Sequence, residues 1–229
     1  MITTEFPFDR PKARDLNEAR LDHLASLGLD LSHKRVLETG AGIGLLTGFW
    51  ERRECEVIST EGRQANIDEH LRRHPHREGK VLLLDLERPG SHDHLGPFDV
   101  VFCYGTLYHV PDPYQILEDL ARVCRNLFLL ESRVWWLDDG QVHEHADSNG
   151  LDQALRRHSC LPSRNWLLDR LREIYGYAYV SVRQPRSYQF PLVWPTEPSS
   201  KTRAIFVASR SALHLDTLSE RLLNKQEYL

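Results

Sequence analysis

Residues 36–44, Val-Leu-Glu-Thr-Gly-Ala-Gly-Ile-Gly, decide the fold of this chain. An apolar run, typical of a buried β-strand, passes at Glu38 into a glycine-rich turn, and an apolar helix-like pattern follows over residues 45–50. Because glycine has no side chain, main chain in such a turn can approach a nucleotide-like ligand closely. The turn alone is also compatible with a structural role, so a cofactor site needs a second signal.

That second signal is Glu61, which ends the next strand pattern, residues 56–60. It lies about 20 residues beyond the first glycine, the spacing expected of a carboxylate that binds a ribose diol at the tip of the second strand. A nicotinamide dinucleotide and S-adenosylmethionine (SAM) both satisfy these two features.

Three further features favour SAM over a dinucleotide. Glu38, directly before the turn, would repel a pyrophosphate but would pair with the α-amino group of a methionine moiety. A third strand pattern over residues 80–84 ends in Asp85, which suits the amino group of an adenine. A fourth, residues 98–104, leads into residues 105–110 at the level where reacting atoms would lie.

Glu38 to Gly44, Glu61, Asp85 and Phe98 to His109 together resemble the successive motifs of class I SAM-dependent methyltransferases, over roughly residues 34–133. The resemblance implies an α/β, Rossmann-like class I methyltransferase fold, with a mostly parallel seven-stranded sheet and helices on both faces. It also implies SAM as the cofactor, with contacts from Glu38, Gly40, Ala41, Gly42, Gly44, Glu61, Gly62, Asp85, Leu86 and Tyr104.

A narrower resemblance involves residues 105–109, 161–163 and 202–208, which are similar to the catalytic domain of tRNA wobble-uridine carboxymethyltransferases. In that family the matching tyrosine and arginine hold the extra carboxylate of carboxy-SAM, and here they would be Tyr108 and Arg203. Related small-molecule and sugar methyltransferases share the same sequence motifs, so SAM and carboxy-SAM both remain possible methyl or carboxymethyl donors.

Length and composition indicate one α/β domain of ordinary globular character, with 229 residues, 41% hydrophobic and 27% charged. No apolar stretch reaches the roughly 18 residues that a membrane helix needs. Residues 1–6 lack a secretory pattern, so we expect a cytoplasmic protein with no membrane partner. The formal net charge of −4 and the scattered basic residues favour a small-molecule substrate over nucleic acid.

Cysteines and histidines predict no metal site. The four cysteines form no C-x-x-C pair, and Cys103 and Cys124 fall in apolar patterns typical of buried thiols. The run His143-Glu144-His145-Ala146-Asp147 is the best metal candidate, but spacing alone does not build a site. We therefore expect no metal.

Alternating patterns predict the order of elements along the chain. A helix is expected over residues 12–29, followed by strands and helices at 35–39, 44–52, 56–60, 64–73, 80–84, 98–104, 113–124 and 126–133. Residues 177–183 and 202–209 are predicted as the final two strands, and the resemblance to class I methyltransferases implies that they pair antiparallel. The predicted single domain comprises an N-terminal covering helix (1–33), a SAM-binding core (34–133), a substrate or lid insertion (134–162), a C-terminal helix with closing strands (163–210) and a helical tail (211–229). The tail either packs on its own domain or meets a second copy in a homodimer.

His109 is the leading candidate for a general base, although a histidine satisfied by backbone at a strand end is an equal interpretation. Tyr108, also predicted as catalytic, would orient the methionine end or pack as a wall. Arg203 lies in an apolar strand pattern, so it meets either an anionic ligand or an internal carboxylate. The predicted substrate contacts are Arg203, Glu131, His143, Arg164 and Trp194, with Arg133, Trp135, Trp136 and His145 as further candidates.

These residues support methyl transfer to an oxygen or nitrogen of a small molecule as the leading hypothesis. Carboxymethyl transfer from carboxy-SAM, a non-catalytic SAM-binding protein and a nicotinamide-dependent oxidoreductase are the alternatives. The sequence does not identify the acceptor.

Overall fold

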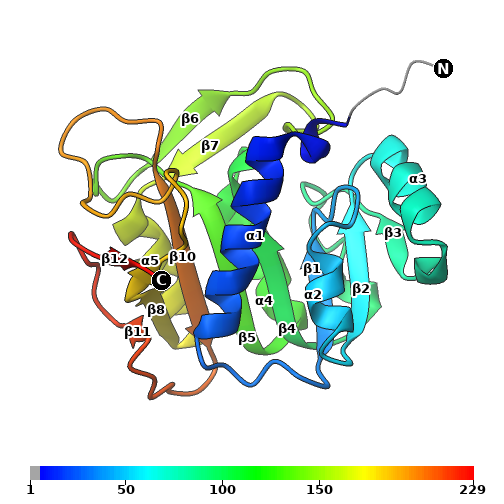
Figure 1. The fold of residues 1–229 in the computed structure, drawn as a ribbon, viewed down its shortest axis with the longest axis horizontal. Helices are drawn as coiled ribbons and strands as arrows, with labels where there is room; N and C mark the ends of the chain where they lie inside the picture. Colours follow the sequence, from blue (N-terminus) through cyan, green and yellow to red (C-terminus); the bar gives the residue numbers. More distant parts are fainter. Residues whose placement is uncertain (1–5) are drawn as a thin grey trace.

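The computed structural model describes residues 6–229, so the first five residues of the predicted N-terminal segment lie outside it. Eight strands form one sheet: β1 (Arg35–Thr39), β2 (Glu56–Glu61), β3 (Val81–Leu83), β4 (Phe98–Tyr104), β5 (Cys124–Arg133), β8 (Tyr177–Ser181), β10 (Arg203–Ser209) and β11 (Leu218–Ser219). Their order is β11-β8-β10-β5-β4-β1-β2-β3 (Figure 1). Strands β1 to β5 pair in parallel, and β10 runs antiparallel to both β5 and β8.

This topology confirms the predicted mostly parallel Rossmann-like sheet and its antiparallel closing pair. The two-residue strand β11 is an eighth strand that the sequence did not predict; it pairs with β8. The central strand β4 is apolar except for Asp99, and β5 is apolar over residues 127–130, because helices bury both faces of the sheet there.

Five α-helices accompany the sheet: α1 (Pro11–Ser26), α2 (Thr47–Glu51), α3 (Gln64–Arg73), α4 (Pro113–Val123) and α5 (Arg164–Tyr175). One core cluster packs α4 and α5 against one face of the sheet, and another packs α1 and α2 against the other face (Figure 1). Short 3-10 turns lie at η1 (Pro7–Asp9), η2 (Pro75–Arg77), η3 (Asp93–Leu95) and η4 (Leu107–His109). No helix among residues 6–229 is long and apolar enough to cross a membrane.

Local signals explain the helix boundaries that the sequence predicted well. Asp112 accepts a hydrogen bond from the backbone amide of Gln115 at 3.1 Å, and Pro113 begins α4 behind this cap. Helix α1 ends close to Gly28, whose φ of 75° no other residue type adopts easily. Helix α2 is shorter than the predicted 44–52 because the glycine turn extends as far as Leu46.

The insertion after the core contains a β-hairpin, β6 (Val142–Ala146) with β7 (His158–Pro162). The hairpin lies over the carboxyl ends of the parallel strands, next to the start of α1 (Figure 1). The hairpin falls within the insertion predicted over residues 134–162, and the sequence did not predict its strands because the segment is polar and aperiodic.

The prediction of a helical C-terminal tail is wrong. Residues 213–229 contain no helix; they contribute β11 and then β12 (Glu227–Tyr228), which pairs with β9 (Arg183–Gln184). The leucines at helical spacing pack on the domain's own core in extended and turn conformations, where Leu222 and Leu223 join the cluster of α4 and α5. Backbone N–H and C=O groups of this tail form hydrogen bonds with strands and loops at the edge of the domain, in place of the bonds of a helix.

Candidate active site

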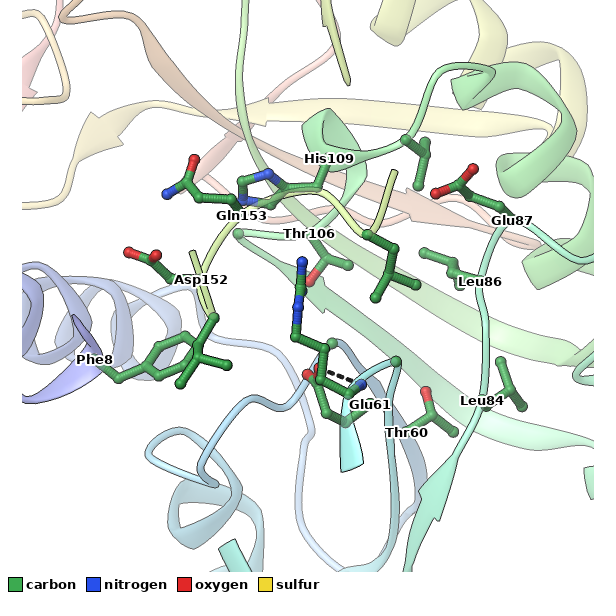
Figure 2. Close-up of a pocket in the computed structure, with 17 residues that line it drawn as sticks. Phe8, Thr60, Glu61, Leu84, Leu86, Glu87, Thr106, His109, Asp152 and Gln153 are labelled. Carbon is green, nitrogen blue, oxygen red and sulfur yellow. Dashed lines mark hydrogen bonds between the residues drawn. The ribbon is translucent and has the colours of Figure 1, made fainter. Parts of the chain in front are cut away.

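Two adjoining cavities open at the carboxyl ends of the parallel strands. The first has a volume of about 100 Å³ and extends from Glu61 to His109, with apolar walls that include Leu86 and Leu155. The second has a volume of about 250 Å³ and lies between α1 and the ends of β4, β5 and β10. Both cavities are lined by Phe8, Gly40, Gly105, His109, Asp152 and Gln153. Figure 2 shows Thr60 and Glu61 at one end of the first cavity and His109 with Gln153 at the other.

The glycine turn forms a wall of both cavities and requires glycine at position 40. Gly40 has a φ of 63°, and a Cβ atom there would lie 2.4 Å from Oγ1 of Thr106. Thr106 cannot easily move away, since this hydroxyl donates a hydrogen bond to the carbonyl oxygen of Thr39 at 3.0 Å. The turn and the η4 loop are therefore in close contact, which brings His109 near the glycine turn.

Glu61 ends β2 and lines the first cavity, where a ribose-binding carboxylate is expected. Its buried carboxylate lines the first cavity and accepts from the backbone amides of Gly42 (2.9 Å) and Arg63 (3.0 Å) and from Nδ2 of Asn66 (3.1 Å). An ionised carboxylate has about four acceptor sites, so it can still accept from hydroxyl groups of a ligand. The same side chain thus organises the glycine turn and faces the cavity.

Glu38 corrects one prediction. Its carboxylate lies beneath the turn, where it accepts from the hydroxyls of Thr47 (2.6 Å) and Ser59 (2.8 Å), and it lines neither cavity. Burial raises its pKa, although the two hydroxyl bonds act in the opposite direction. Glu38 therefore supports the turn from inside instead of contacting a methionine amino group.

Three other predicted cofactor contacts also lie outside the cavities. Gly42 binds Glu61 through its amide, and the carbonyl of Gly44 accepts from Nη1 of Arg77 at 3.0 Å. Asp85 forms a salt bridge with Arg156 on the insertion, so its carboxylate is engaged away from the cavity. The remaining predicted cofactor residues do line the two cavities: Gly40, Ala41, Glu61, Gly62, Leu86 and Tyr104.

His109 belongs to a histidine–carboxylate pair. Its Nδ1 lies 2.6 Å from Oδ2 of Asp147, which also accepts from the backbone amide of Ala154 at 3.0 Å. Burial raises the pKa of Asp147, but the His109 and Ala154 hydrogen bonds outweigh this and hold it below its ordinary value. An ionised Asp147 selects the tautomer with the proton on Nδ1, which leaves Nε2 as an acceptor. The ring lines both cavities and so lies at their junction.

A buried cluster of two arginines and one carboxylate closes the far side of the second cavity. Glu131, with no exposed surface, accepts from Nη2 of Arg20 and from Nη1 of Arg203, the latter at 2.9 Å. Arg203 also donates from Nε to Gln189 (2.8 Å) and from Nη2 to the hydroxyl of Tyr108 (3.2 Å). Arg203 therefore meets an internal carboxylate and lines the cavity at once. Glu131 itself lines neither cavity, so the prediction that it contacts substrate is corrected.

Three further predicted substrate contacts are structural. Arg164 donates from Nε to Asp138 at 3.1 Å, and its guanidinium lies 3.5 Å above the ring of Trp194. His143 pairs with Asp139 at 2.8 Å and stacks on Trp135. Arg164, Trp194 and His143 line neither cavity; they hold the insertion and the C-terminal segment against the sheet.

The sequence analysis missed Phe8, Arg20, Asp147 and the lid residues 151–155. A signal existed for Arg20, because it lies one turn from Leu16 on the buried stripe of α1, where an unpaired charge is costly. Asp147 had been considered only as part of a metal motif. Among residues 6–229, no group of three or more histidine, cysteine or acidic side chains is arranged to hold a metal ion.

Comparisons with known proteins agree with this geometry. A family profile described as a methyltransferase domain matches residues 37–126. The chain is 31% identical to a ubiquinone biosynthesis O-methyltransferase of Alkalilimnicola ehrlichii over 112 residues, covering 48% of this chain and 45% of that protein. A Vibrio cholerae protein of the same name is 29% identical over the same shares. The chain thus spans less than half the length of these curated relatives.

Over residues 37–126 the chain matches a methyltransferase domain, and its fold as a whole is of the class I methyltransferase type. Its fold is similar to the N-terminal domain of EvdMO1, solved with S-adenosylhomocysteine (SAH) and D-fucose, with a TM-score of 0.63 at 23% identity over 88% of this chain and 84% of that one. It is also similar to a magnesium protoporphyrin IX methyltransferase of Synechocystis with bound SAM, with a TM-score of 0.55 at 14% identity over 86% and 79%. SAM is the cofactor of such domains.

The residues of this methyltransferase domain suit SAM. Nε of Arg20 and the hydroxyl of Tyr104 are buried without a hydrogen-bond partner among residues 6–229, and both side chains line the second cavity. A methionine carboxylate is the type of group that would satisfy these two donors. A ribose hydroxyl would donate to the remaining acceptor site of the Glu61 carboxylate, and an adenine would pack against the apolar walls of the first cavity.

Proposed function

We propose that this chain is a SAM-dependent methyltransferase that transfers a methyl group to an oxygen or nitrogen of a small-molecule acceptor. The observation that carries this proposal is the His109–Asp147 pair, which holds an imidazole at the junction of the two cavities. The O-methyltransferase names of the relatives support oxygen as the acceptor atom.

The proposed chemistry divides between cofactor and protein. When bound, SAM supplies an electrophilic methyl group on its sulfonium. Glu61, Gly40 and Arg20 would hold the donor, and Nε2 of His109 would accept the proton from the acceptor's hydroxyl or amino group. Asp147 would stabilise the resulting imidazolium through Nδ1. Leu151, Asp152, Gln153 and Leu155 of the insertion would restrict water near the reacting atoms, since they line the first cavity.

Carboxymethyl transfer, the alternative suggested by Tyr108 and Arg203, has less support. The two side chains are hydrogen-bonded and line the second cavity, as that resemblance implies. However, three of the five N–H groups of Arg203 already donate to protein acceptors, and its charge is paired with Glu131. We therefore propose SAM as the donor.

We also propose that the protein acts in the cytoplasm. All four of its cysteines are free thiols, which is typical of reducing compartments. The formal net charge of −4 further supports a small-molecule substrate over nucleic acid.

Calorimetric titration of the purified protein with SAH tests the cofactor, with NAD as the control ligand. We expect micromolar SAH binding and no NAD binding. Glu61→Ala should abolish SAH binding, because it removes both the ribose acceptor and the bond to the Gly42 amide. A folded protein that does not bind SAH would disprove the methyltransferase proposal.

Turnover of an acceptor library, followed as SAH release, tests the base. We predict that His109→Gln lowers kcat by about 10²- to 10⁴-fold, because it removes the proton acceptor. The Kd for SAH should change by less than about threefold, a difference in binding free energy below about 1 kcal/mol. His143→Gln is the matched control, because His143 also pairs with a carboxylate on the insertion but lines neither cavity. Equal activities of the two variants would exclude His109 as the base. SAH binding without turnover of any acceptor would favour the non-catalytic alternative.

A further inference from the structure

We propose that the acceptor carries an oxyanion, a carboxylate or a phosphate, and that Arg133 recognises it. This inference rests on the methyl-transfer function proposed above and defines the class of substrate for the same site. It depends on the position of Arg133, the charge of the second cavity and the partners of its three arginines.

Arg133 ends β5 and is directly opposite Arg203 in the antiparallel pairing of β5 with β10. Like charges at directly opposite positions on neighbouring strands destabilise a sheet. Both guanidiniums nevertheless lie against the ring of Tyr108, at 5.8 Å for Arg133 and 5.2 Å for Arg203. An anion bound beside Tyr108 would relieve this repulsion.

The charged side chains that line the second cavity are mostly positive. Arg20, Arg133 and Arg203 line it with Asp152, whereas Glu131 and Asp147 lie behind the wall, bonded to arginines and to His109 respectively. SAM adds no net negative charge, because its carboxylate is offset by its ammonium group and the sulfonium is positive. A wall with mainly positive side chains favours a ligand that brings negative charge. The acceptor is the component that can supply this negative charge.

The three arginines differ in the donors that they can still offer. Arg20 lies beside Gly105 at the end of β4, with Nη2 3.1 Å from the position of a Cβ on that residue, and its Nε suits the donor's carboxylate. Three of the five N–H groups of Arg203, one on each nitrogen, already donate to protein acceptors, so it keeps only one N–H on each Nη. In the described part of the chain, the side chain of Arg133 has no hydrogen bond or salt bridge, so its fork of donors is available for bidentate binding of an oxyanion.

Calorimetry with two matched probes tests this assignment. The SAH-saturated protein is titrated with 3,4-dihydroxybenzoate and with 3,4-dihydroxybenzyl alcohol, which has the same ring hydroxyls but no charge, in a low-salt buffer without phosphate. We expect the acid to bind at least about tenfold more tightly than the alcohol, as one well-placed charged contact provides. Arg133→Met should remove this preference, and Arg133→Lys should retain part of it.

Arg125→Met is the matched control, since Arg125 is an exposed arginine at the opposite end of the same strand. It should retain the wild-type preference. Displacement of the acid by inorganic phosphate would assign phosphate-bearing acceptors, and failure of phosphate to compete would assign carboxylates. An acid that binds no more tightly than the alcohol, or a preference that survives Arg133→Met, would overturn the inference.

Failure of the methyltransferase proposal is distinguishable from this result. It would appear as absence of SAH binding, and the preference for the acid would then be measured on the protein without SAH. Conversely, SAH binding with no preference for the acid would leave methyl transfer in place and reject only the anionic acceptor.

Discussion

The two cavities handle buried charge in opposite ways. Around the glycine turn, the carboxylates of Glu38 and Glu61 are satisfied by hydroxyl, amide and backbone N–H groups, without a salt bridge. Around the second cavity, Arg20 and Arg203 share the single carboxylate of Glu131. In the first region uncharged donors satisfy the carboxylates, whereas in the second region one carboxylate is the counterion of two arginines. The difference predicts where a single substitution does most damage.

The largest effect should come from the shared carboxylate. Glu131→Gln leaves two buried arginines without a counterion, and we expect a loss of about 3–5 kcal/mol in the free energy of unfolding. Glu38→Gln is the matched substitution in the first region; because burial raises the pKa of Glu38 and its partners are hydroxyls, it should cost about 1 kcal/mol or less. Urea unfolding of both variants measures the difference. Equal losses would remove the distinction between the two regions.

Acid should weaken both regions through their buried histidines. Burial lowers the pKa of His70, beneath the glycine turn, and of His23, on α1, to about 4. An unfolded histidine takes up its proton near pH 6.5, so between pH 6.5 and 4 the unfolded chain binds more protons than the folded one. Stability is therefore complete above about pH 6.5 and falls as the pH falls, by about 2 kcal/mol for each histidine at about pH 5.

His23→Gln tests this origin of the acid sensitivity. The free energy of unfolding, measured with urea at about pH 7.5 and about pH 5, should fall between these pH values by about 2 kcal/mol less in His23→Gln than in the wild type. The reason is that the variant lacks one titrating group. An unchanged difference would mean that His23 takes no part in the acid response.

The glycine turn should tolerate even a methyl group poorly. Gly40→Ala combines a positive φ with the contact to Thr106, whereas Gly79→Ala has a φ of 77° and open space around the new Cβ. We expect Gly40→Ala to be less stable than Gly79→Ala by about 1–3 kcal/mol and to bind SAH more weakly. Thermal unfolding and SAH calorimetry of the two variants separate the steric contact with Thr106 from the backbone strain that both share. A similar loss of stability in both variants would exclude a contribution from the Thr106 contact.

The smallest effect concerns the lid. Leu155 is 36% exposed and lies over Gly62, where it forms part of the wall of the first cavity. Leu155→Ala should weaken SAH binding by about three- to tenfold through lost apolar contact. Leu137→Ala, at a residue 45% exposed and outside the cavities, should leave the affinity unchanged. A wild-type affinity in Leu155→Ala would remove the lid from the cofactor site.

The same contrast explains how much the sequence could predict. The strands, the glycine turn and Glu61 were predictable because neighbours in sequence build that region, and the bond between Gly42 and Glu61 joins residues 19 apart. The second cavity joins α1, η4, β5 and β10, so no local spacing reports it. Arg203 was recognised as a charge needing a partner, but only the register of β10 against β5 shows that the partner is Glu131.

Two errors have a common physical cause. The leucines of the tail have helical spacing, yet pairing at the sheet edge satisfies their backbone instead. The position of Glu38 beside the turn predicts a ligand contact. Its side chain instead lies beneath the turn, because successive side chains of β1 point to opposite faces of the sheet and the hydroxyls of Thr47 and Ser59 bind its carboxylate. In both cases tertiary partners decided what local pattern left open.

The link between Arg20 and Glu131 also has a consequence for the order of events during synthesis. The two residues are 111 positions apart, so at about 5–20 residues per second a ribosome makes Arg20 roughly 5–20 s before its counterion. The first helix therefore cannot bury its charged face until the fifth strand has emerged, whereas the glycine turn meets Glu61 much sooner. In the nascent chain, the region of the glycine turn takes shape first, and the region around the second cavity closes last.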